Sequence, residues 1–395
     1  MRTSTTIPLK PVTGRQRGFS LIELMVGVVV GLLAVLVITQ VLTLAEGKRR
    51  TISMGADAQV NGALALFTLQ RDIEQSGYGA VAQPYSLGCT VKYKSSGGTG
   101  TFTLAPVVIT DGGSSAASDS ITVLTGNTVN FSAPMFLSSN ALQSDDHFTV
   151  TSSFGATVGD MMIAVPMASP TTAAWTADGS VPCGVFTVTS SGTTAPTALT
   201  STNVPHASSS GWNQSIVFPS TGILSGSYLL DMGALVSRTY SVSSRGNLQS
   251  TDLSQTDATK TTADLYPQIV MLKALYGKDT DHDGKVDTYD KTAPGSSAEW
   301  LAVKSVRIAL VARSNQYEKD AVTTSAPRWD VGSVISVAGT SACSGSSNCL
   351  SMDVSTIVGA DWQHYRYKVY DTIVPLRNVL WSNCKTTASA LSNCS

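Results

Sequence analysis

The sequence is poor in charged side chains and in histidine, and the common catalytic motifs are missing from it. Only 13% of its 395 residues are charged, against roughly 25% in typical soluble domains. It contains no HExxH, no GxSxG, no Walker phosphate loop and no GxGxxG placed before a helix. The four histidines are scattered, at His147, His206, His282 and His364. These absences argue against an enzyme, and we expect no catalytic residues.

An excess of positive charge is also missing. The chain has 26 basic and 27 acidic residues, a net charge of -1, and its 7% of aromatic residues are not interleaved with basic clusters. Four basic residues and no acid stand in the first 18 residues: Arg2, Lys10, Arg15 and Arg17. A chain that loses this stretch is mildly acidic and has no bulk electrostatic attraction for nucleic acid. We therefore do not expect direct binding of nucleic acid.

Cysteine is absent from the first 88 residues and occurs in an even number after them. The six residues are Cys89, Cys183, Cys343, Cys349, Cys384 and Cys394. No spacing among them is a CxxC zinc or redox pattern, and such usage favours disulfides in an exported region. The short loops 343–349 and 384–394 could each close locally, which would leave Cys89 with Cys183. Free buried thiols are the alternative.

One long apolar run, residues 19–45, stands out at the N-terminus. As a helix it would measure about 40 Å, enough for a hydrocarbon core of about 30 Å. It is longer than a usual signal-peptide core and lacks a clear A-x-A cleavage site. Gly18 comes immediately before it, and Glu23 stands inside it, where an ionised acid normally implies a function and a partner. Gly27 and Gly31 form a small-xxx-small pair that permits close helix contact, or are incidental.

The string Gly18-Phe19-Ser20-Leu21-Ile22-Glu23 resembles the processing and methylation motif of type IV prepilins and pseudopilins. The resemblance implies that a membrane peptidase cuts between Gly18 and Phe19, and that the new amine of Phe19 is then methylated. It also implies that Glu23 attracts the N-terminal amine of a neighbouring subunit during assembly. A snorkelling acid near the end of a plain membrane anchor is the alternative interpretation of Glu23.

The chain after the apolar run first continues as a predicted helix over residues 46–78. Apolar residues at Val60, Leu64, Phe67 and Ile73 suit one helical face, which we expect to pack on the head. A Gly-Tyr-Gly breaker at 77–79 is expected to end this helix.

Short alternating runs follow, separated by glycine and polar residues, and they predict a β-rich head over 79–395. The candidate strands are Ser120–Leu124, Phe148–Thr151, Met161–Val165, Val185–Thr189, Ser227–Leu230, Leu235–Val242, Ile269–Leu275, Val303–Val311 and Tyr365–Tyr370. The most apolar two, Ile269–Leu275 and Val303–Val311, are expected at the centre of a sheet. Ser190–Ser210 is rich in serine and threonine and is expected to form loops.

An acidic loop, residues 279–290, has the spacing of an EF-hand-type calcium loop. Its sequence DTDHDGKVDTYD puts five acids at loop positions one, three, five, nine and twelve, and Gly284 at the sharp turn. The predicted ligands are Asp279, Asp281, Asp283, the backbone carbonyl of Lys285, Asp287 and Asp290. Aspartate replaces the usual glutamate at position twelve, and the flanks do not read as helices. We therefore expect a structural calcium ion in an isolated loop, with a solvated acidic turn as the alternative.

Four further segments, 66–79, 109–123, 276–290 and 367–378, resemble PilW-type minor pilins. The resemblance implies an α+β, type IV pilin-like fold, in which a long N-terminal helix packs on a large antiparallel β-rich head. The expected parts are a cleaved basic leader (1–18), a transmembrane assembly helix (19–45), its periplasmic continuation (46–78) and the head (79–395). Arg377, in the last segment, is expected to pair with an acid of the head.

The function implied is that of a minor pilin that helps to initiate type IV pili and enters them, in a tip or priming complex. The implied partners are the prepilin peptidase and methylase, other minor pilins, the major pilin, a tip adhesin and the inner-membrane assembly platform. The implied location is the inner membrane, with the head in the periplasm, and then the pilus at the cell surface. The associated activities are twitching motility and cell adhesion. The alternatives are a minor pseudopilin of type II secretion and a surface- or DNA-binding module at the pilus tip.

Overall fold

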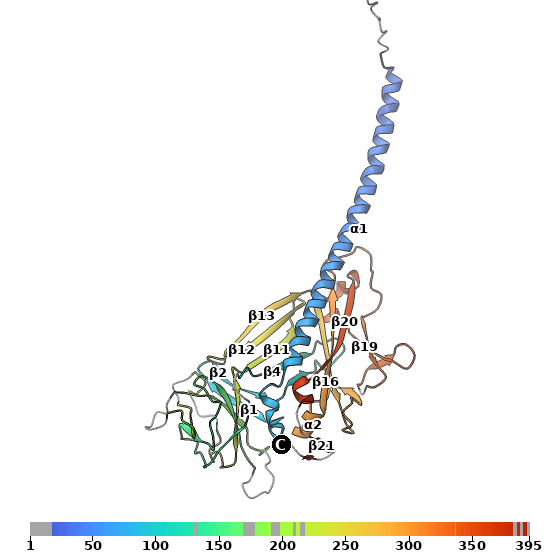
Figure 1. The fold of residues 1–395 in the computed structure, drawn as a ribbon. Coiled ribbons are helices and arrows are strands. Elements are labelled where there is room, and N and C mark those ends of the chain that lie inside the picture. Colours follow the sequence, from blue (N-terminus) through green and yellow to red (C-terminus); the bar gives the residue numbers. More distant parts are fainter. Residues whose placement is uncertain are drawn as a thin grey trace, which may run out of the picture. The chain divides into compact units, whose positions relative to one another are not determined.

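The protein is described here from a computed structural model. The residues it describes are 18–128, 133–168, 178–190, 198–207, 211–213, 218–335, 337–381, 385–387 and 390–392. The chain divides into two compact units, Met1–Ser53 and Met54–Ser395. The boundary lies inside helix α1 (Leu21–Gln75), the longest helix in Figure 1. Residues 1–17 of the predicted leader (1–18) lie outside the described part.

In the first unit, helix α1 is apolar on every side. From Leu21 to Gly47 it is long and apolar enough to cross a membrane, and all its side chains in that range whose exposure is described are exposed. A run of leucine, valine and isoleucine without proline keeps the backbone helical, because every peptide group can then be bonded within the helix. This part of the chain therefore has the length and the apolar surface of a membrane anchor.

In the second unit, helix α1 is amphipathic, but not with the face that the sequence predicted. Val60, Leu64 and Phe67 are exposed, and only Ile73 of the predicted face is buried. The buried face is formed instead by Ala58, Gly62, Ala65, Leu69 and Ile73. Small residues occupy its first half because the helix lies very close to strand β20 (Tyr367–Pro375). A Cβ atom at Gly62 would stand only 2.4 Å from the ring of Tyr370.

The helix ends at Gln75, just before the predicted breaker. Gly77 follows with a backbone φ of +82°, a value that glycine adopts readily. Its amide donates a hydrogen bond to the carbonyl of Leu124 (2.8 Å), so the chain passes directly from the helix to the sheet. A Cβ atom at Gly77 would meet the side chain of Val81 at 2.8 Å.

Two sheets pack against this helix. The five-stranded sheet has the order β13 (Lys260–Pro267), β12 (Asn247–Leu253), β11 (Val236–Val242), β4 (Ser120–Thr125), β3 (Val107–Thr110). The four-stranded sheet has the order β15 (Thr288–Asp290), β14 (Ile269–Lys278), β16 (Val303–Arg313), β20. A shared core joins Leu69 and Ile73 of the helix to Tyr240, Leu272 and Ile308 of the sheets. Figure 1 shows β11, β4, β16 and β20 beside this part of the helix.

The remaining strands form a larger sheet and several small ones. The six-stranded sheet has the order β2 (Gly98–Thr103), β1 (Thr90–Ser95), β8 (Cys183–Thr187), β7 (Met161–Val165), β10 (Tyr228–Gly233), β5 (Met135–Phe136). The small sheets are β17 (Arg328–Gly332), β19 (Asn348–Ser351), β18 (Thr340–Ala342); β6 (His147–Thr149), β9 (Asn203–Pro205); and β21 (Lys385–Thr387), β22 (Ala390–Ser392). The short helices are η1 (Ala80–Ala82), η2 (Pro84–Ser86), α2 (Ser297–Ala302), α3 (Ser355–Val358), η3 (Ala360–His364) and α4 (Arg377–Leu380). The strand pairs are antiparallel apart from β1 and β8.

The predicted strands all overlap observed ones, and the two most apolar, now β14 and β16, are confirmed at the centre of their sheet. Continuous apolar runs predict such strands well, because both of their faces are buried. The loop predicted over Ser190–Ser210 was wrong in one place. Strand β9 lies within it, because the buried Val204 pairs with Phe148 of β6.

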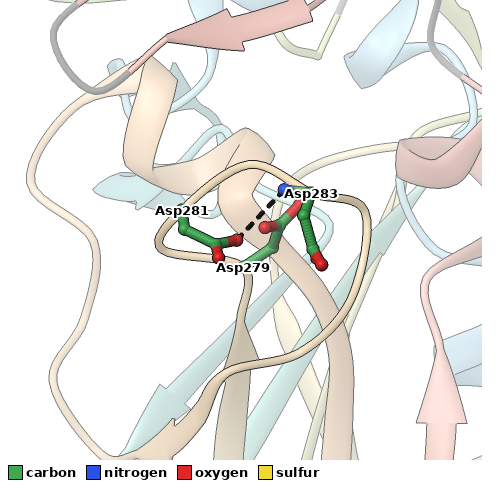
Figure 2. A group of neighbouring side chains, drawn as sticks. All are labelled: Asp279, Asp281 and Asp283. Atoms are coloured by element: carbon green, nitrogen blue, oxygen red, sulfur yellow. Dashed lines mark hydrogen bonds between the residues drawn. The ribbon is translucent and has the colours of Figure 1, made fainter.

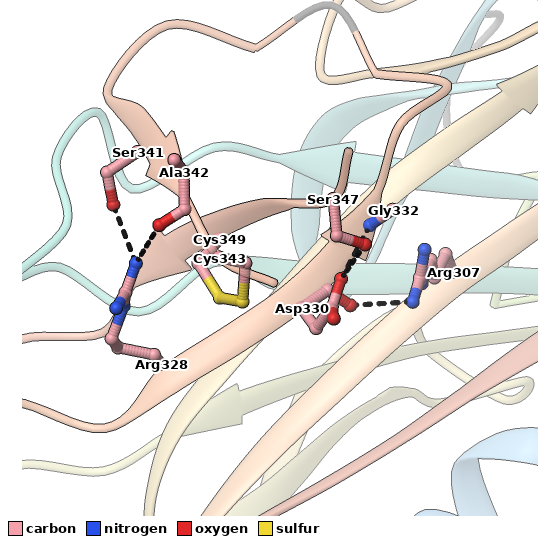
Figure 3. The surroundings of a disulfide bond; sticks show 9 residues. All are labelled: Arg307, Arg328, Asp330, Gly332, Ser341, Ala342, Cys343, Ser347 and Cys349. Carbon is pink, nitrogen blue, oxygen red and sulfur yellow. Dashed lines mark hydrogen bonds between the residues drawn. A yellow bond between two sulfur atoms is a disulfide. The ribbon is translucent and has the colours of Figure 1, made fainter. Parts of the chain in front are cut away.

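Two disulfides link the head. Cys89 and Cys183 join the starts of β1 and β8 across 94 residues of sequence. Cys343 and Cys349 close the β18–β19 hairpin (Figure 3). Beside this hairpin, Arg307 donates hydrogen bonds to the backbone carbonyls of Val331 and Asp330, at 2.8 and 2.7 Å. The third suggested pair, Cys384 and Cys394, lies outside the described residues.

Candidate functional sites at the N-terminus and in an acidic loop

The predicted processing point is open to a peptidase. Gly18, Phe19 and Ser20 precede helix α1 in non-helical conformation and are exposed, Phe19 to 86%. No described atom lies within 4 Å of the position that a Cβ atom would take at Gly18. Proteases cut most readily at accessible peptides outside regular secondary structure, and Gly18 and Phe19 are exposed and non-helical.

Glu23 lies in the first turn of helix α1 and contacts its own chain there. The backbone amide of Ser20 donates a hydrogen bond to Glu23 Oε2 (3.4 Å), and the carbonyl of Ser20 accepts one from the amide of Leu24 (3.1 Å). This is the glutamate half of a capping box, S-x-x-E, which satisfies a free amide at the helix start. The sequence contains that pattern, but we did not predict the capping role. Glu23 therefore has a local function in addition to the intermolecular one implied by the motif.

The acidic loop connects β14 to β15, and its first residue is buried. The side chain of Asp279 is only 2% exposed. Its Oδ2 accepts a hydrogen bond from the amide of Gly284 (3.1 Å) and lies 3.9 Å from Lys304 Nζ. Its buried Oδ1 has no hydrogen-bond partner among the described residues. The carboxylates of Asp281 and Asp283 complete a group whose oxygen atoms all lie within 4.8 Å of one another (Figure 2).

Hydrogen bonds within the loop fix its turns. The amide of Asp283 donates to Asp281 Oδ1 (3.1 Å), a bond drawn in Figure 2. Asp283 accepts bonds from both the ammonium and the amide of Lys285, and these hold the pKa of its carboxyl below the usual value. Gly284 has a φ of +90°, as its place at the sharp turn requires.

Two of the predicted ligands point elsewhere. Asp287 Oδ2 accepts bonds from the amide and the hydroxyl of Thr280 and from the amide of Asp281, at 2.6, 2.9 and 3.1 Å. These bonds lower the pKa of its carboxyl. Asp290 pairs with Lys278 (2.7 Å) on the neighbouring strand. One carboxylate oxygen of Asp287 and one of Asp290 are thus engaged by the hairpin itself, whereas the carboxylates of Asp279, Asp281 and Asp283 lie close to one another.

Sequence analysis did not identify Lys278 and Lys304 as neighbours of this site. Lys278 forms an ion pair with Asp290. Lys304 lies beside Asp279, and burial lowers the pKa of the Lys304 ammonium. Lys278 stands just before the loop and is paired with it by the hairpin register, which was a signal that could have been used. Lys304 belongs to β16, outside the loop, so the spacing of residues within the loop could not identify it.

Comparison with known families gave two matches. Residues 13–39 match the prokaryotic N-terminal methylation motif. Residues 236–378 match the family model of the type IV pilus-assembly protein W, PilW. Together the two matches support a PilW-family type IV minor pilin. Searches of curated proteins and of solved structures found no match for it. The PilW family is one of structural, pilin-like proteins, and the N-terminal match together with the apolar helix supports membrane anchoring.

The PilW-matched segment contains the groups that hold the end of helix α1. Asp72 accepts bonds from Arg238 (2.8 Å) and from the hydroxyl of Tyr240 (2.6 Å), both on β11. At the other end of the segment, Arg377 pairs with Glu74 (3.0 Å). The side-chain amide of Asn378 donates hydrogen bonds to the backbone carbonyls of Gln75 and Ser76. Arg377 was predicted to pair with an acid of the head, and this was wrong: its acid partner is Glu74 of the helix.

A cavity of about 380 Å³ opens between β1–β2 and β11–β13 of this minor pilin. Its lining is mostly threonine and apolar residues, with Tyr93 and Lys260 as its ionisable side chains.

Proposed function

We propose that this minor pilin helps to start the assembly of type IV pili in a tip or priming complex, and is then incorporated into the filament. The observation that carries the proposal is the size of its head. The unit Met54–Ser395 contains four hydrophobic clusters and the three large sheets described above. A head of this size is bulky to repeat along a shaft, so a position occupied by few copies suits it best.

The apolar part of helix α1 supports the route into the filament. From Leu21 to Gly47 it buries none of its side chains in its own chain, so it needs a lipid or protein environment. Before assembly this environment is the inner membrane, with the head in the periplasm. The two disulfides of the head fit such an oxidising compartment.

The proposed partners follow the same order. The prepilin peptidase and methylase act at Gly18 and Phe19. The assembly platform of the inner membrane and the other minor pilins then receive the processed helix, followed by the major pilin and a tip adhesin. Glu23 attracts the Phe19 amine of a neighbouring subunit, because a carboxylate among apolar side chains is stabilised by an opposite charge.

Replacing Glu23 in two ways separates this charge pairing from helix capping. Glu23→Gln keeps the capping box, since glutamine bonds the Ser20 amide as glutamate does, whereas Glu23→Val removes both. If the charge is what matters, both variants should insert into the membrane normally but enter filaments at a level reduced by about tenfold or more, as loss of an ion pair worth a few kcal/mol predicts. Immunoblots of sheared pili against membrane fractions measure this.

Glu46→Gln is the matched control, because it removes the same charge from the exposed far end of the apolar run. Normal incorporation of Glu23→Gln with loss of Glu23→Val would assign Glu23 to capping alone. The assembly role itself is tested by affinity purification of the full mature chain with co-expressed minor pilins. Recovery with pseudopilins of type II secretion, and not with pilus minor pilins, would overturn the proposal.

A further inference from the structure

The acidic loop carries a second inference, independent of the assembly role. Three carboxylates, those of Asp279, Asp281 and Asp283, place oxygen atoms within 4.8 Å of one another. Such spacing is what a single cation bound between them requires. Without one, three negative charges at this distance repel each other.

The buried oxygen of Asp279 points to a ligand more directly than the cluster does. A carboxylate oxygen that is buried without a hydrogen bond is costly, on the order of 1–3 kcal/mol or more for a charged group. Asp279 Oδ1 is buried and has no partner among the described residues, while Oδ2 is held by Gly284 and approached by Lys304. A cation inside the loop would satisfy Oδ1 and explain why an aspartate is buried there.

The lysines near the loop do not replace such a cation. Lys285 pairs with Asp283 while its side chain remains 82% exposed, where ion pairs contribute little. Lys304 Nζ lies 3.9 Å from the bonded oxygen of Asp279 and donates a hydrogen bond to the carbonyl of Leu301 (2.9 Å). The unpaired side of the cluster is therefore left for an external ion.

We propose that the loop binds one calcium ion through Asp279, Asp281 and Asp283, without Asp290. The donors are all oxygen atoms, which suits calcium or magnesium and not the metals that prefer imidazole or thiolate. Calcium accepts six to eight ligands in flexible geometry, so backbone carbonyls and water can complete the shell of a short loop. Magnesium demands a near-ideal octahedron, and a loop whose turns are fixed by its own hydrogen bonds is poorly suited to adjust to it.

The ion would fasten one end of the four-stranded sheet. The amide of Asp279 donates to the carbonyl of Ala302 (2.9 Å), just before β16, and the amide of Asp287 donates to the carbonyl of Lys278 (2.9 Å). Binding would hold the loop against both β14 and β16. Without a bidentate acid at position twelve, we expect a dissociation constant of about 10⁻⁴–10⁻³ M, the range of extracellular calcium modules.

The test uses the full mature chain in detergent, treated with chelator and then titrated with CaCl₂ or MgCl₂ in a calorimeter. We expect one calcium per chain and a rise in Tm of about 3 °C at tenfold saturation. Asp281→Asn and, as a second exposed position, Asp283→Asn should each weaken calcium binding by about tenfold or more, because each removes a charged ligand. Asp320→Asn is the matched control, since Asp320 is exposed and outside the loop.

Asp290→Asn distinguishes this ligand set from the EF-hand one. Because Asp290 pairs with Lys278 in the structure, its replacement should change the calcium affinity by less than about threefold, whereas loss of a position-twelve ligand would abolish binding. The proposal is overturned if the wild-type chain shows neither heat nor a Tm shift with calcium up to 10 times the expected constant. It is also overturned if magnesium binds more tightly, or if Asp281→Asn and Asp283→Asn bind calcium as the wild type does.

Discussion

Between Leu21 and Gly47 none of the described side chains of helix α1 is buried, whereas from Ala58 to Ile73 one face of the same helix is covered by the head. The exposed part is made of large apolar residues. The buried face begins with small ones, Ala58, Gly62 and Ala65. Within this helix, large apolar side chains are exposed between Leu21 and Gly47, and small ones stand at the start of the packed face, before the buried Leu69 and Ile73.

Val60, Leu64 and Phe67 form a stripe of large, exposed apolar side chains on the part of the helix that belongs to the second unit. These side chains are 55%, 46% and 62% exposed, on the side of the helix away from the buried face. They add apolar surface next to the anchor that the head does not cover. Exposed and buried side chains therefore differ between the two faces of the helix after Ala58, as well as between its N-terminal and C-terminal parts.

The largest effect is expected at Gly18, the residue before the predicted cut. Gly18→Val should leave an uncut precursor, because a branched side chain at the cleavage point blocks the peptidase that the motif implies. Incorporation into pili should then be lost completely. The mass of the membrane-bound chain on a gel or by mass spectrometry measures processing. Normal processing of the variant would place the cut elsewhere.

Truncating one leucine in each part tests the comparison next. Leu69 is fully buried and Leu33 is 59% exposed. Leu69→Ala should lower the free energy of unfolding of the head by about 2–5 kcal/mol, because it leaves a cavity in the core. Leu33→Ala should leave it unchanged. Thermal unfolding of the full chain in detergent, followed by the near-UV signal of the head, measures both. Equal losses would show that Leu33 is packed within the chain.

The glycines give a smaller and sharper contrast. Gly62 faces the ring of Tyr370, whereas a Cβ placed at Gly31 meets no described atom within 4 Å beyond its chain neighbours and the nearby backbone of its own helix. Gly62→Val should therefore cost about 1–3 kcal/mol of head stability, since it overfills a close contact. Gly31→Val should not lower the Tm of the head, and should reduce incorporation if the small-xxx-small pair is used between subunits. A head that tolerates Gly62→Val without loss of stability would contradict the close approach.

Features that depend on a local sequence pattern could be predicted, whereas those that depend on distant residues could not. The motif Gly18–Glu23 and the central strands β14 and β16 were found because each depends on a local pattern. The packed face of the helix was missed because hydrophobic periodicity favours large residues, and it gave no weight to Ala58, Gly62 and Ala65. The approach of Tyr370, more than 300 residues later in the chain, is what makes small residues necessary there.

In the acidic loop, too, local spacing predicted some features of the site and not others. Spacing alone identified Asp279, Asp281 and Asp283, which the structure brings together. Spacing also assigned Asp290 to the ion, whereas its pairing with Lys278 depends on the register of β14 and β15. The burial of Asp279 was likewise beyond a local pattern, because it is produced by the neighbouring strand β16.

The bonds at the end of helix α1 have a mechanical consequence. Arg238 and Tyr240 hold Asp72 from one side, while Arg377 and Asn378 hold the last turn through Glu74 and two backbone carbonyls. A pull along the helix axis would load these bonds and the packed face of the helix together, in shear, so they could not open one after another. Since the holding groups come from strand β11 and helix α4, tension would be spread over both sheets that pack against the helix.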